Sequence, residues 1–249
     1  MRIVYLIMIF LFTFSLHAKQ PILIASDTYH VINDDNPEYA YPITDKSQWQ
    51  KHAFNGFVIR PDISWFQIDF ELPHRHESTQ NFGVFVSILG SFEAYWDGQL
   101  IAKNGVVGHS KSTETPGIID KIMLIPPALS SPGKHTLSLR VSSQHVPLGL
   151  ENGSFFSLVT DYEQLIQLPY KKASRPLIMS GALLLVALYS LFLYFTSFKQ
   201  ASYLIFSGLC LTILCLLLTE SWRGLAPYTY DWQIPRLQLV LVLSCLASL

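Results

Sequence analysis

Residues 176–219 read PLIMSGALLLVALYSLFLYFTSFKQASYLIFSGLCLTILCLLLT, and this stretch decides the fold of the 249-residue chain. It holds two apolar segments, 177–198 and 201–219, with Lys199 as the one charged residue between them. Each segment has about 20 residues, enough for an α-helix to cross a hydrocarbon core of about 30 Å. Neither carries the polar stripe of a helix in a soluble protein. The stretch therefore predicts a tight membrane hairpin.

Small side chains in these segments predict close contact between the two helices, because they let two backbones approach each other. They are Ser180, Gly181, Ser190, Ser207 and Gly208.

The composition separates a polar part of the chain from this membrane part. Apolar residues make up 50% of the chain and charged residues 14%, with a mean hydropathy of +0.30, yet only five charged residues follow Pro176. The preceding part is long enough for one hydrophobic core. Acidic residues outnumber basic ones there, which gives no support for nucleic-acid binding. All three cysteines (Cys210, Cys215 and Cys245) lie in apolar segments, so the polar part needs no disulfide.

Residues 1–18 have the pattern of a secretory signal peptide: Arg2, an apolar run over 3–14, and Ser15-Leu16-His17-Ala18. Cleavage after Ala18 is favoured, an uncleaved anchor is the alternative, and both export the part that follows. Three basic residues before the first span oppose this topology by the positive-inside rule: Lys171, Lys172 and Arg175. Because long domains are translocated largely regardless of flanking charge, we expect 19–160 to be periplasmic.

Residues 19–160 show the alternation typical of β-strands. In 64–72, Phe66, Ile68, Phe70 and Leu72 fall on one face and polar residues on the other. Further strands are predicted at 82–89, 92–96, 99–102, 121–125, 135–141 and 154–159. Asp97-Gly98 between two of them is a strong β-hairpin signal. Many short strands with almost no helical pattern predict an antiparallel β-sandwich.

Residues 161–175 are predicted to form a juxtamembrane helix and linker. Thr160 and Glu163 have capping-box spacing, and the helix is expected to cover 161–168 and end near Pro169. This segment either transmits changes in the outer domain or is a passive tether.

The transmembrane region, 176–249, is expected to be incomplete. Residues 220–236 are polar, with aromatic residues suited to a membrane interface: Trp222, Tyr228, Tyr230 and Trp232. The third apolar run, 237–249, has about 13 residues, too few to cross a bilayer. We expect the N-terminal part of a longer membrane protein, with a truncated product as the alternative.

Two motifs resemble galactose-binding-like jelly rolls. Residues 91–105 (SFEAYWDGQLIAKNG) resemble the strand–turn–strand of those domains, and 132–141 (PGKHTLSLRV) resemble their Gly-x-His-x-Leu-x-Leu-Arg strand. With a signal peptide before and spans behind, the order of parts resembles bacterial seven-transmembrane receptors with diverse intracellular signalling modules. The resemblance implies an all-β jelly-roll sandwich followed by an α-helical transmembrane bundle and a cytoplasmic output, such as a histidine kinase or a diguanylate cyclase. The chain departs from that family by having two complete spans and no output domain.

Three residues are candidates for ligand binding. Trp49 and Trp65 could stack on a sugar ring, and Arg140 could hold an acidic or hydroxylated ligand. The alternative for the tryptophans is packing in the core or at its rim. Glu151 could also hold a polar ligand, but for both Arg140 and Glu151 a solvated sheet face is the favoured alternative. Trp96, by contrast, is predicted to lie in the core.

Catalysis and metal binding are not predicted. Glu93 and Asp97 are two nearby carboxylates, as a glycosidase would need. Asp97, however, falls in the predicted turn, where its side chain is expected to stabilise the turn. His74-Arg75-His76 has ligand-like spacing without a third ligand and is interpreted as surface. We therefore predict no metal, no cofactor and no enzymatic activity within this chain.

Two functions remain. The first is the N-terminal sensor and membrane portion of a bacterial receptor, which binds a small ligand outside, with a carbohydrate as one candidate, and shifts the helices between two states. Its partners would be that ligand, the lipid bilayer and a cytoplasmic signalling module, with a homodimer as a further candidate. The second is a membrane-tethered carbohydrate-binding or adhesion module without signalling. A transporter fragment is a weaker third, because the spans carry no charge.

Overall fold

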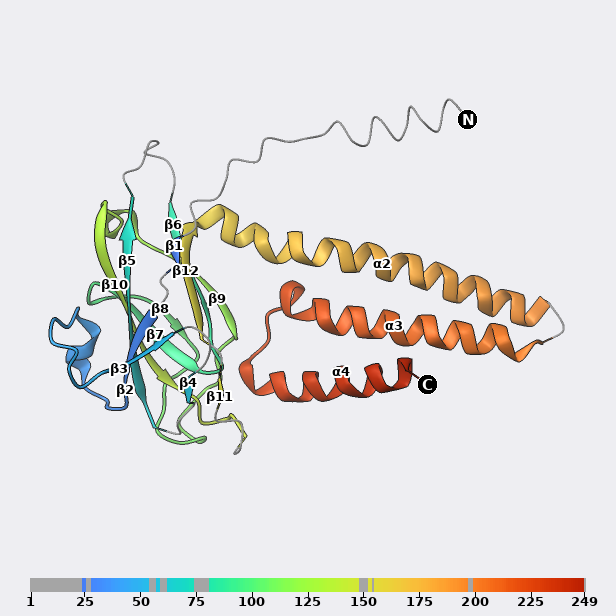
Figure 1. Ribbon diagram of the computed structural model, residues 1–249, viewed down its shortest axis with the longest axis horizontal. Coiled ribbons are helices and arrows are strands. Elements are labelled where there is room, and N and C mark those ends of the chain that lie inside the picture. The colour runs from blue at the N-terminus through green and yellow to red at the C-terminus, as the bar shows by residue number, and fades with distance from the viewer. Residues whose placement is uncertain are drawn as a thin grey trace, which may run out of the picture.

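The computed structural model describes residues 24–25, 28–53, 57–58, 62–73, 81–147, 152–153, 155–196 and 199–248. It contains a β-sandwich joined to three helices (Figure 1). The predicted signal peptide, the segment His74-Arg75-His76 and Glu151 lie outside the described residues.

The strands form two main sheets, and every pairing is antiparallel. The larger sheet has the order β3 (Gln50–Ala53), β2 (Thr28–Ile32), β5 (Ser64–Leu72), β10 (Gly133–Ser142), β7 (Ser91–Trp96) and β8 (Gln99–Asn104). The smaller has the order β1 (Ile24–Ala25), β12 (Phe156–Asp161), β6 (Phe82–Ser87) and β9 (Asp120–Leu124). A short pair joins β4 (Phe57–Val58) and β11 (Asn152–Gly153), and three 3-10 turns are η1 (Pro37–Ala40), η2 (Pro127–Leu129) and η3 (Tyr230–Trp232).

The core lies between the two sheets. Phe66, Ile68 and Phe70 of β5 belong to one buried cluster with Val84 and Val86 of β6. Trp96 is part of the same cluster, as predicted, and its indole N–H donates to the Leu129 carbonyl at 3.0 Å. The predicted antiparallel sandwich is therefore confirmed, because alternation buries one face of each strand against the opposite sheet.

The hairpin between β7 and β8 turns at Asp97 and Gly98. Their φ angles are 50° and 87°, which is the positive pair that a type I′ turn requires. The Asp97 carboxylate accepts from the backbone N–H of Thr136 at 2.8 Å and lies 2.6 Å from Nδ1 of His135. The Asp97 side chain therefore connects the turn to β10, in agreement with the prediction that it has a structural role in the turn.

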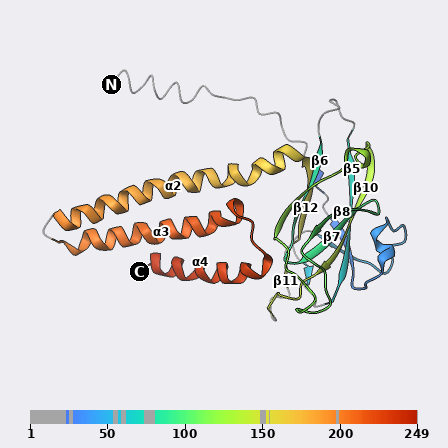
Figure 2. The ribbon, with the colours of Figure 1, turned by 180° about the vertical axis from the view of Figure 1, so that it is seen from behind.

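Two of the three helices, α2 (Tyr162–Thr196) and α3 (Ala201–Leu225), are long and apolar enough to cross a membrane. They lie side by side as a hairpin and extend away from the sandwich (Figures 1 and 2). The third helix, α4 (Gln233–Ala247), packs against α3.

The prediction that a separate helix ends near Pro169 was wrong, because α2 continues through Pro169 and Pro176. Proline removes one backbone hydrogen bond and costs about 3 kcal/mol inside a helix. Packing on both sides offsets this: Leu165 is buried against the sandwich, and Gly224 of α3 lies against the Pro169 carbonyl. At 35 residues and 1.5 Å per residue, α2 is about 52 Å long, so about 20 Å extends beyond a hydrocarbon core.

The predicted contact between small residues is confirmed in part. Ser180 and Ser190 of α2 are buried, and the Ser207 hydroxyl of α3 donates to the Ala187 carbonyl of α2 at 2.9 Å. Gly181 and Gly208, in contrast, face open space, where a Cβ would meet nothing within 4 Å. These two glycines therefore do not create the close approach between helices, and Ala187 does so in their place.

Candidate functional site

An open hollow of about 400 Å³ lies on the outward face of the larger sheet. The segment 33–49, which includes η1, covers this face and is drawn in blue in Figures 1 and 2. The hollow is lined by Asp35, Pro37, Ala40, Tyr41, Trp65, Glu93, Tyr95, Gly98 and Arg140. Two of the three predicted ligand-binding residues, Trp65 and Arg140, thus meet in one place.

The third candidate, Trp49, lies just behind the hollow. It packs with Ala40 and Trp65 in a small cluster of its own, and the Tyr39 ring contacts both tryptophans edge-on, with centroid distances of 5.1 Å to Trp49 and 6.3 Å to Trp65. Only 8% of Trp49 and 1% of Trp65 is exposed. Neither indole can therefore offer an open face to a sugar ring, and their rings hold the 33–49 segment in place.

Three polar contacts also fasten the 33–49 segment to the sheet. The side-chain amide of Gln67 donates to the carbonyls of Tyr39 and Tyr41, at 3.0 and 2.8 Å. Lys46 pairs with Asp69 at 2.8 Å. Each contact links the segment to β5, so the wall of the hollow is a fixed part of the domain.

Arg140 binds Asp35 through two parallel hydrogen bonds. Its Nε and Nη2 atoms donate to the two carboxylate oxygens, both at 2.6 Å. These bonds from Arg140 hold the pKa of Asp35 below its usual value, against the opposing effect of burial, and raise the pKa of Arg140 in turn. The Arg140 fork that the sequence assigned to a ligand is therefore occupied by a protein carboxylate.

Glu93 closes the other side of the Arg140 side chain. Its carboxylate lies 3.5 Å from Nη1 of Arg140, pairs with Lys103 at 2.8 Å and accepts from the Tyr95 hydroxyl at 3.1 Å. Burial acts to raise the pKa of Glu93, but the hydrogen bonds from Lys103 and Tyr95 outweigh it and lower the pKa. Both carboxylates of the hollow are ionised at neutral pH.

A second group of contacts, which we call the helix joint, connects the sandwich to the helices at three points. At the start of α2, a Cβ on Gly83 would come within 2.9 Å of both Leu165 and Tyr162, so the glycine lets the helix rest directly on β6. At the end of α3, Arg223 donates two hydrogen bonds to Asp120 of β9, at 2.6 and 2.7 Å, and a third to Ser87 of β6 at 3.0 Å.

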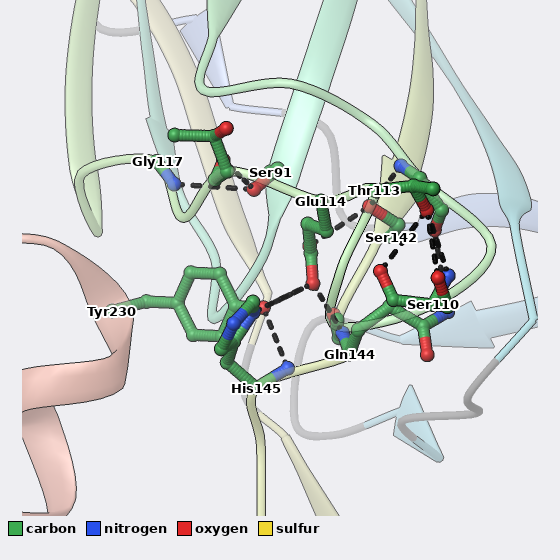
Figure 3. A network of polar contacts seen from close by, with 12 residues as sticks. Ser91, Ser110, Thr113, Glu114, Gly117, Ser142, Gln144, His145 and Tyr230 are labelled. Carbon is green, nitrogen blue, oxygen red and sulfur yellow. Dashed lines mark hydrogen bonds and ion pairs between the residues drawn. The ribbon is translucent and has the colours of Figure 1, made fainter.

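The third point of the helix joint is Tyr230, in the connection between α3 and α4 (Figure 3). Its hydroxyl donates to Glu114 at 2.8 Å and accepts from the backbone N–H of His145 at 3.0 Å. Tyr230 is only 2% exposed, and burial raises its pKa above the usual value. Its predicted place at a membrane interface is therefore wrong: an aromatic residue beside apolar segments fits an interface equally well, and only the fold brings Glu114 to it.

Glu114 itself has no exposed side-chain surface. Besides Tyr230, it accepts from the Ser142 hydroxyl at 2.8 Å and the Gln144 backbone N–H at 2.7 Å, and Nδ1 of His145 lies 3.1 Å away (Figure 3). Three donors and the nearby imidazole compensate the loss of water around a buried carboxylate. No spacing in the sequence identified Glu114, because its partners come from the end of β10, the residues just after it and a connection more than 100 residues away.

Comparisons with known proteins leave the family open. No protein-family model matches the chain, and no curated protein matches it either. Similar solved structures include β-glucuronidases from Bacteroides uniformis (16% identity, TM-score 0.42, 57% of this chain and 18% of that one), Bifidobacterium dentium (10%, 0.41, 59% and 31%) and Faecalibacterium prausnitzii (13%, 0.40, 59% and 33%). The chain spans at most a third of the length of these three proteins, and similarity at this level establishes neither a shared family nor a shared activity.

Proposed function

We propose that the chain is the N-terminal sensor and membrane portion of a bacterial signal-transduction receptor. Its sandwich, which we assign to the galactose-binding-like jelly rolls, binds a small ligand in the hollow on the periplasmic side. The α2–α3 hairpin crosses the inner membrane and relays the bound state to a C-terminal cytoplasmic output, such as a histidine kinase or a diguanylate cyclase. The receptor family is the bacterial seven-transmembrane class with diverse intracellular signalling modules.

The observation that carries this proposal is the helix joint. A passive tether needs only one covalent link between a domain and its anchor, which here is the start of α2. The sandwich also binds the C-terminal end of α3, through Arg223. It binds the connection that follows α3 as well, through Tyr230. A change in the sandwich therefore acts on both helices of the hairpin.

The hollow and the helix joint share two strands of the larger sheet. On β10, Arg140 of the hollow is two residues from Ser142, which binds Glu114. On β7, Glu93 of the hollow is two residues from Ser91, whose hydroxyl binds the 115–117 loop. Residues two apart on a strand lie on the same face, so each strand supplies a short physical connection between the two regions.

Hydrogen–deuterium exchange on the full chain in lipid nanodiscs tests the relay. The substitution Asp35→Asn perturbs the hollow, and we expect it to change amide exchange in 226–236 as well as in 33–49. Glu71→Gln, which removes an exposed charge from β5 outside the hollow, is the control and should change neither segment. Exchange in 226–236 that is the same in Asp35→Asn and wild type would favour the alternative, a membrane-tethered binding or adhesion module without signalling.

The topology has its own test. A reporter that is active only in the cytoplasm should be silent when fused at Gln144 and active when fused at Lys199. The opposite result would place the sandwich in the cytoplasm, as the basic residues before the first span favour. The reading frame downstream of Leu249 adds a further check: four more apolar spans and an output domain are expected, and an early stop codon would favour the tether.

A further inference from the structure

The charges around the hollow cancel. Asp35 and Glu93 contribute two negative charges, and Arg140 and Lys103 contribute two positive ones within direct ion-pair distance. His109, whose Nε2 lies 3.6 Å from Asp35, adds a positive charge only when it is protonated. The lowered pKa values of Asp35 and Glu93 keep both carboxylates charged at neutral pH. A ligand with a net charge of either sign therefore gains no Coulomb attraction from this set as a whole.

The guanidinium group of Arg140 is already held between two protein carboxylates. Its Nε and Nη2 atoms each donate to Asp35, and its remaining nitrogen, Nη1, lies 3.5 Å from Glu93. A ligand carboxylate would have to displace Asp35 to gain the same two parallel hydrogen bonds, and elsewhere on the guanidinium it would lie beside at least one protein carboxylate. That rearrangement removes the advantage that a bidentate arginine normally gives to an anion.

The groups that remain available suit hydroxyl groups and an apolar ring face. The Trp65 indole N–H is buried and interacts with Asp35, whose pKa it helps to lower, so it is not one of these groups. The two carboxylates retain acceptor capacity, because each oxygen has two lone pairs. Tyr41 at the rim is 62% exposed and offers an aromatic face.

We infer that the hollow binds an uncharged, hydroxyl-rich ring of sugar size, and that the Asp35–Arg140 pair excludes its acidic counterpart. Hydroxyl groups donate to Asp35 and Glu93, and the ring packs on Tyr41. The volume of about 400 Å³ is within the range of about 300–1,000 Å³ typical of small-molecule sites. The inference rests on the proposed function in taking the hollow as the ligand site, but it does not depend on the relay to the helices.

Matched pairs of sugars test this selectivity on the full chain in nanodiscs. We would titrate the methyl glycosides of glucose, galactose and mannose, each against the methyl glycoside of its uronic acid, by calorimetry and ligand-observed NMR. At least one uncharged member should bind at least about tenfold more tightly than its uronate. Tighter binding of the uronates, or no binding by any uncharged member, would overturn the inference.

The substitution Asp35→Asn should reverse the preference. It frees the Arg140 fork and leaves the hollow with one excess positive charge, so we expect the ratio of uncharged to uronate affinity to fall at least about tenfold. Glu71→Gln should leave that ratio unchanged. An unchanged ratio in a folded Asp35→Asn protein, checked by circular dichroism, would show that Asp35 does not set the selectivity.

A second variant tests the ring contact. Tyr41→Ala removes the exposed aromatic face at the rim of the hollow and leaves Asp35 and Arg140 in place. Uncharged-sugar affinity should fall by about tenfold, while the far-ultraviolet circular dichroism of the sandwich is retained. Wild-type affinity in this variant would place the ligand elsewhere. Because these tests measure binding only, their failure leaves the exchange test of the relay unaffected, and the reverse also holds.

Discussion

Two arginine–aspartate pairs in this molecule have nearly the same geometry and different surroundings. Arg140 binds Asp35 and Arg223 binds Asp120, each through Nε and Nη2, at distances of 2.6 to 2.7 Å. The first pair lies in an open hollow between the larger sheet and the 33–49 segment. The second closes the contact between the end of α3 and β9.

The groups around each pair decide what it can do. Beside Arg140 are a second carboxylate and an exposed tyrosine ring, which are groups that a ligand can use. Beside Arg223 is the Ser87 hydroxyl, which accepts a further hydrogen bond from it at 3.0 Å, and a cavity of only about 10 Å³. A bidentate pair alone therefore does not mark a binding site, and its unused neighbours do.

The largest effect is expected in the helix joint, for Glu114→Leu. This change leaves the Tyr230 hydroxyl, the Gln144 N–H and their neighbours without their acceptor in a buried place. Breaking such a network by removing one partner typically costs about 3–5 kcal/mol. We expect a loss of that size in the free energy of unfolding of the sandwich, measured by thermal unfolding in nanodiscs. Glu71→Leu, at an exposed position, is the control, and a loss as small as the control's would show that the network is dispensable.

The next effect is expected at the hollow, for Gly98→Val. Gly98 has a φ of +87°, and a Cβ there would approach the Tyr41 ring to 2.3 Å, so valine both strains the backbone and displaces the ring. A positive φ in a β-branched residue costs about 1–3 kcal/mol. Gly133→Val is the matched control, because Gly133 also has a positive φ but nothing within 4 Å of its Cβ position. If Gly98→Val destabilises no more than Gly133→Val, the Tyr41 contact contributes nothing.

These regions also show what the sequence can and cannot predict. Alternation in 64–72 and the Asp97-Gly98 turn predicted β5 and the β7–β8 hairpin, because burial of one sheet face and positive φ leave direct marks on residue choice. The apolar segments predicted α2 and α3 for the same kind of reason. The short strands β1, β3, β4 and β11 were not predicted, since two to four residues are too few to show alternation. β2 was also not predicted, although Tyr29 and Val31 do alternate with polar residues there and are buried.

The candidate site was predicted only in part. Trp49, Trp65 and Arg140 do gather on one face, but the sequence did not show that both tryptophans are buried or that Arg140 is already paired. Asp35 lies 105 positions before Arg140, and no local pattern connects them. Asp35 sits in the turn-forming run Asn33-Asp34-Asp35-Asn36-Pro37, which could have drawn attention to it. Glu114 and Tyr230 are 116 positions apart, and their contact depends wholly on the folded chain.

A matched pair of smaller substitutions tests whether the two arginines act in different places. Lysine keeps the charge but loses the planar fork, so each change should cost about 1 kcal/mol at these partly exposed positions. Arg223→Lys should speed amide exchange mainly in 220–229, and Arg140→Lys mainly in 33–49. The same pattern of exchange in both variants would contradict the assignment of one pair to the helix joint and the other to the hollow.

The smallest effect is expected from acid at the hollow. Hydrogen bonds from Arg140 lower the pKa of Asp35 in the folded protein, so ionised Asp35 stabilises the fold above its unfolded pKa of about 3.9. That stabilisation is lost as the pH falls through the lower folded value, which places the transition below about pH 4. Protonation weakens the Arg140 contact and loosens the 33–49 segment, a change that the fluorescence of Trp49 and Trp65 should report. Burial acts to raise the pKa of Asp69, but hydrogen bonds from Lys46 and Thr136 lower it overall, so Asp69 contributes to the same acid response. Asp35→Asn should therefore remove the Asp35 part of the transition, whereas Asp45→Asn, in the same segment but outside the hollow, should retain the whole of it. The Asp45 carboxylate accepts a hydrogen bond from the backbone N–H of Ser47 at 3.0 Å. If Asp45→Asn abolishes the transition instead, the acid response arises from this hydrogen bond, and the Asp35–Arg140 pair does not control the segment.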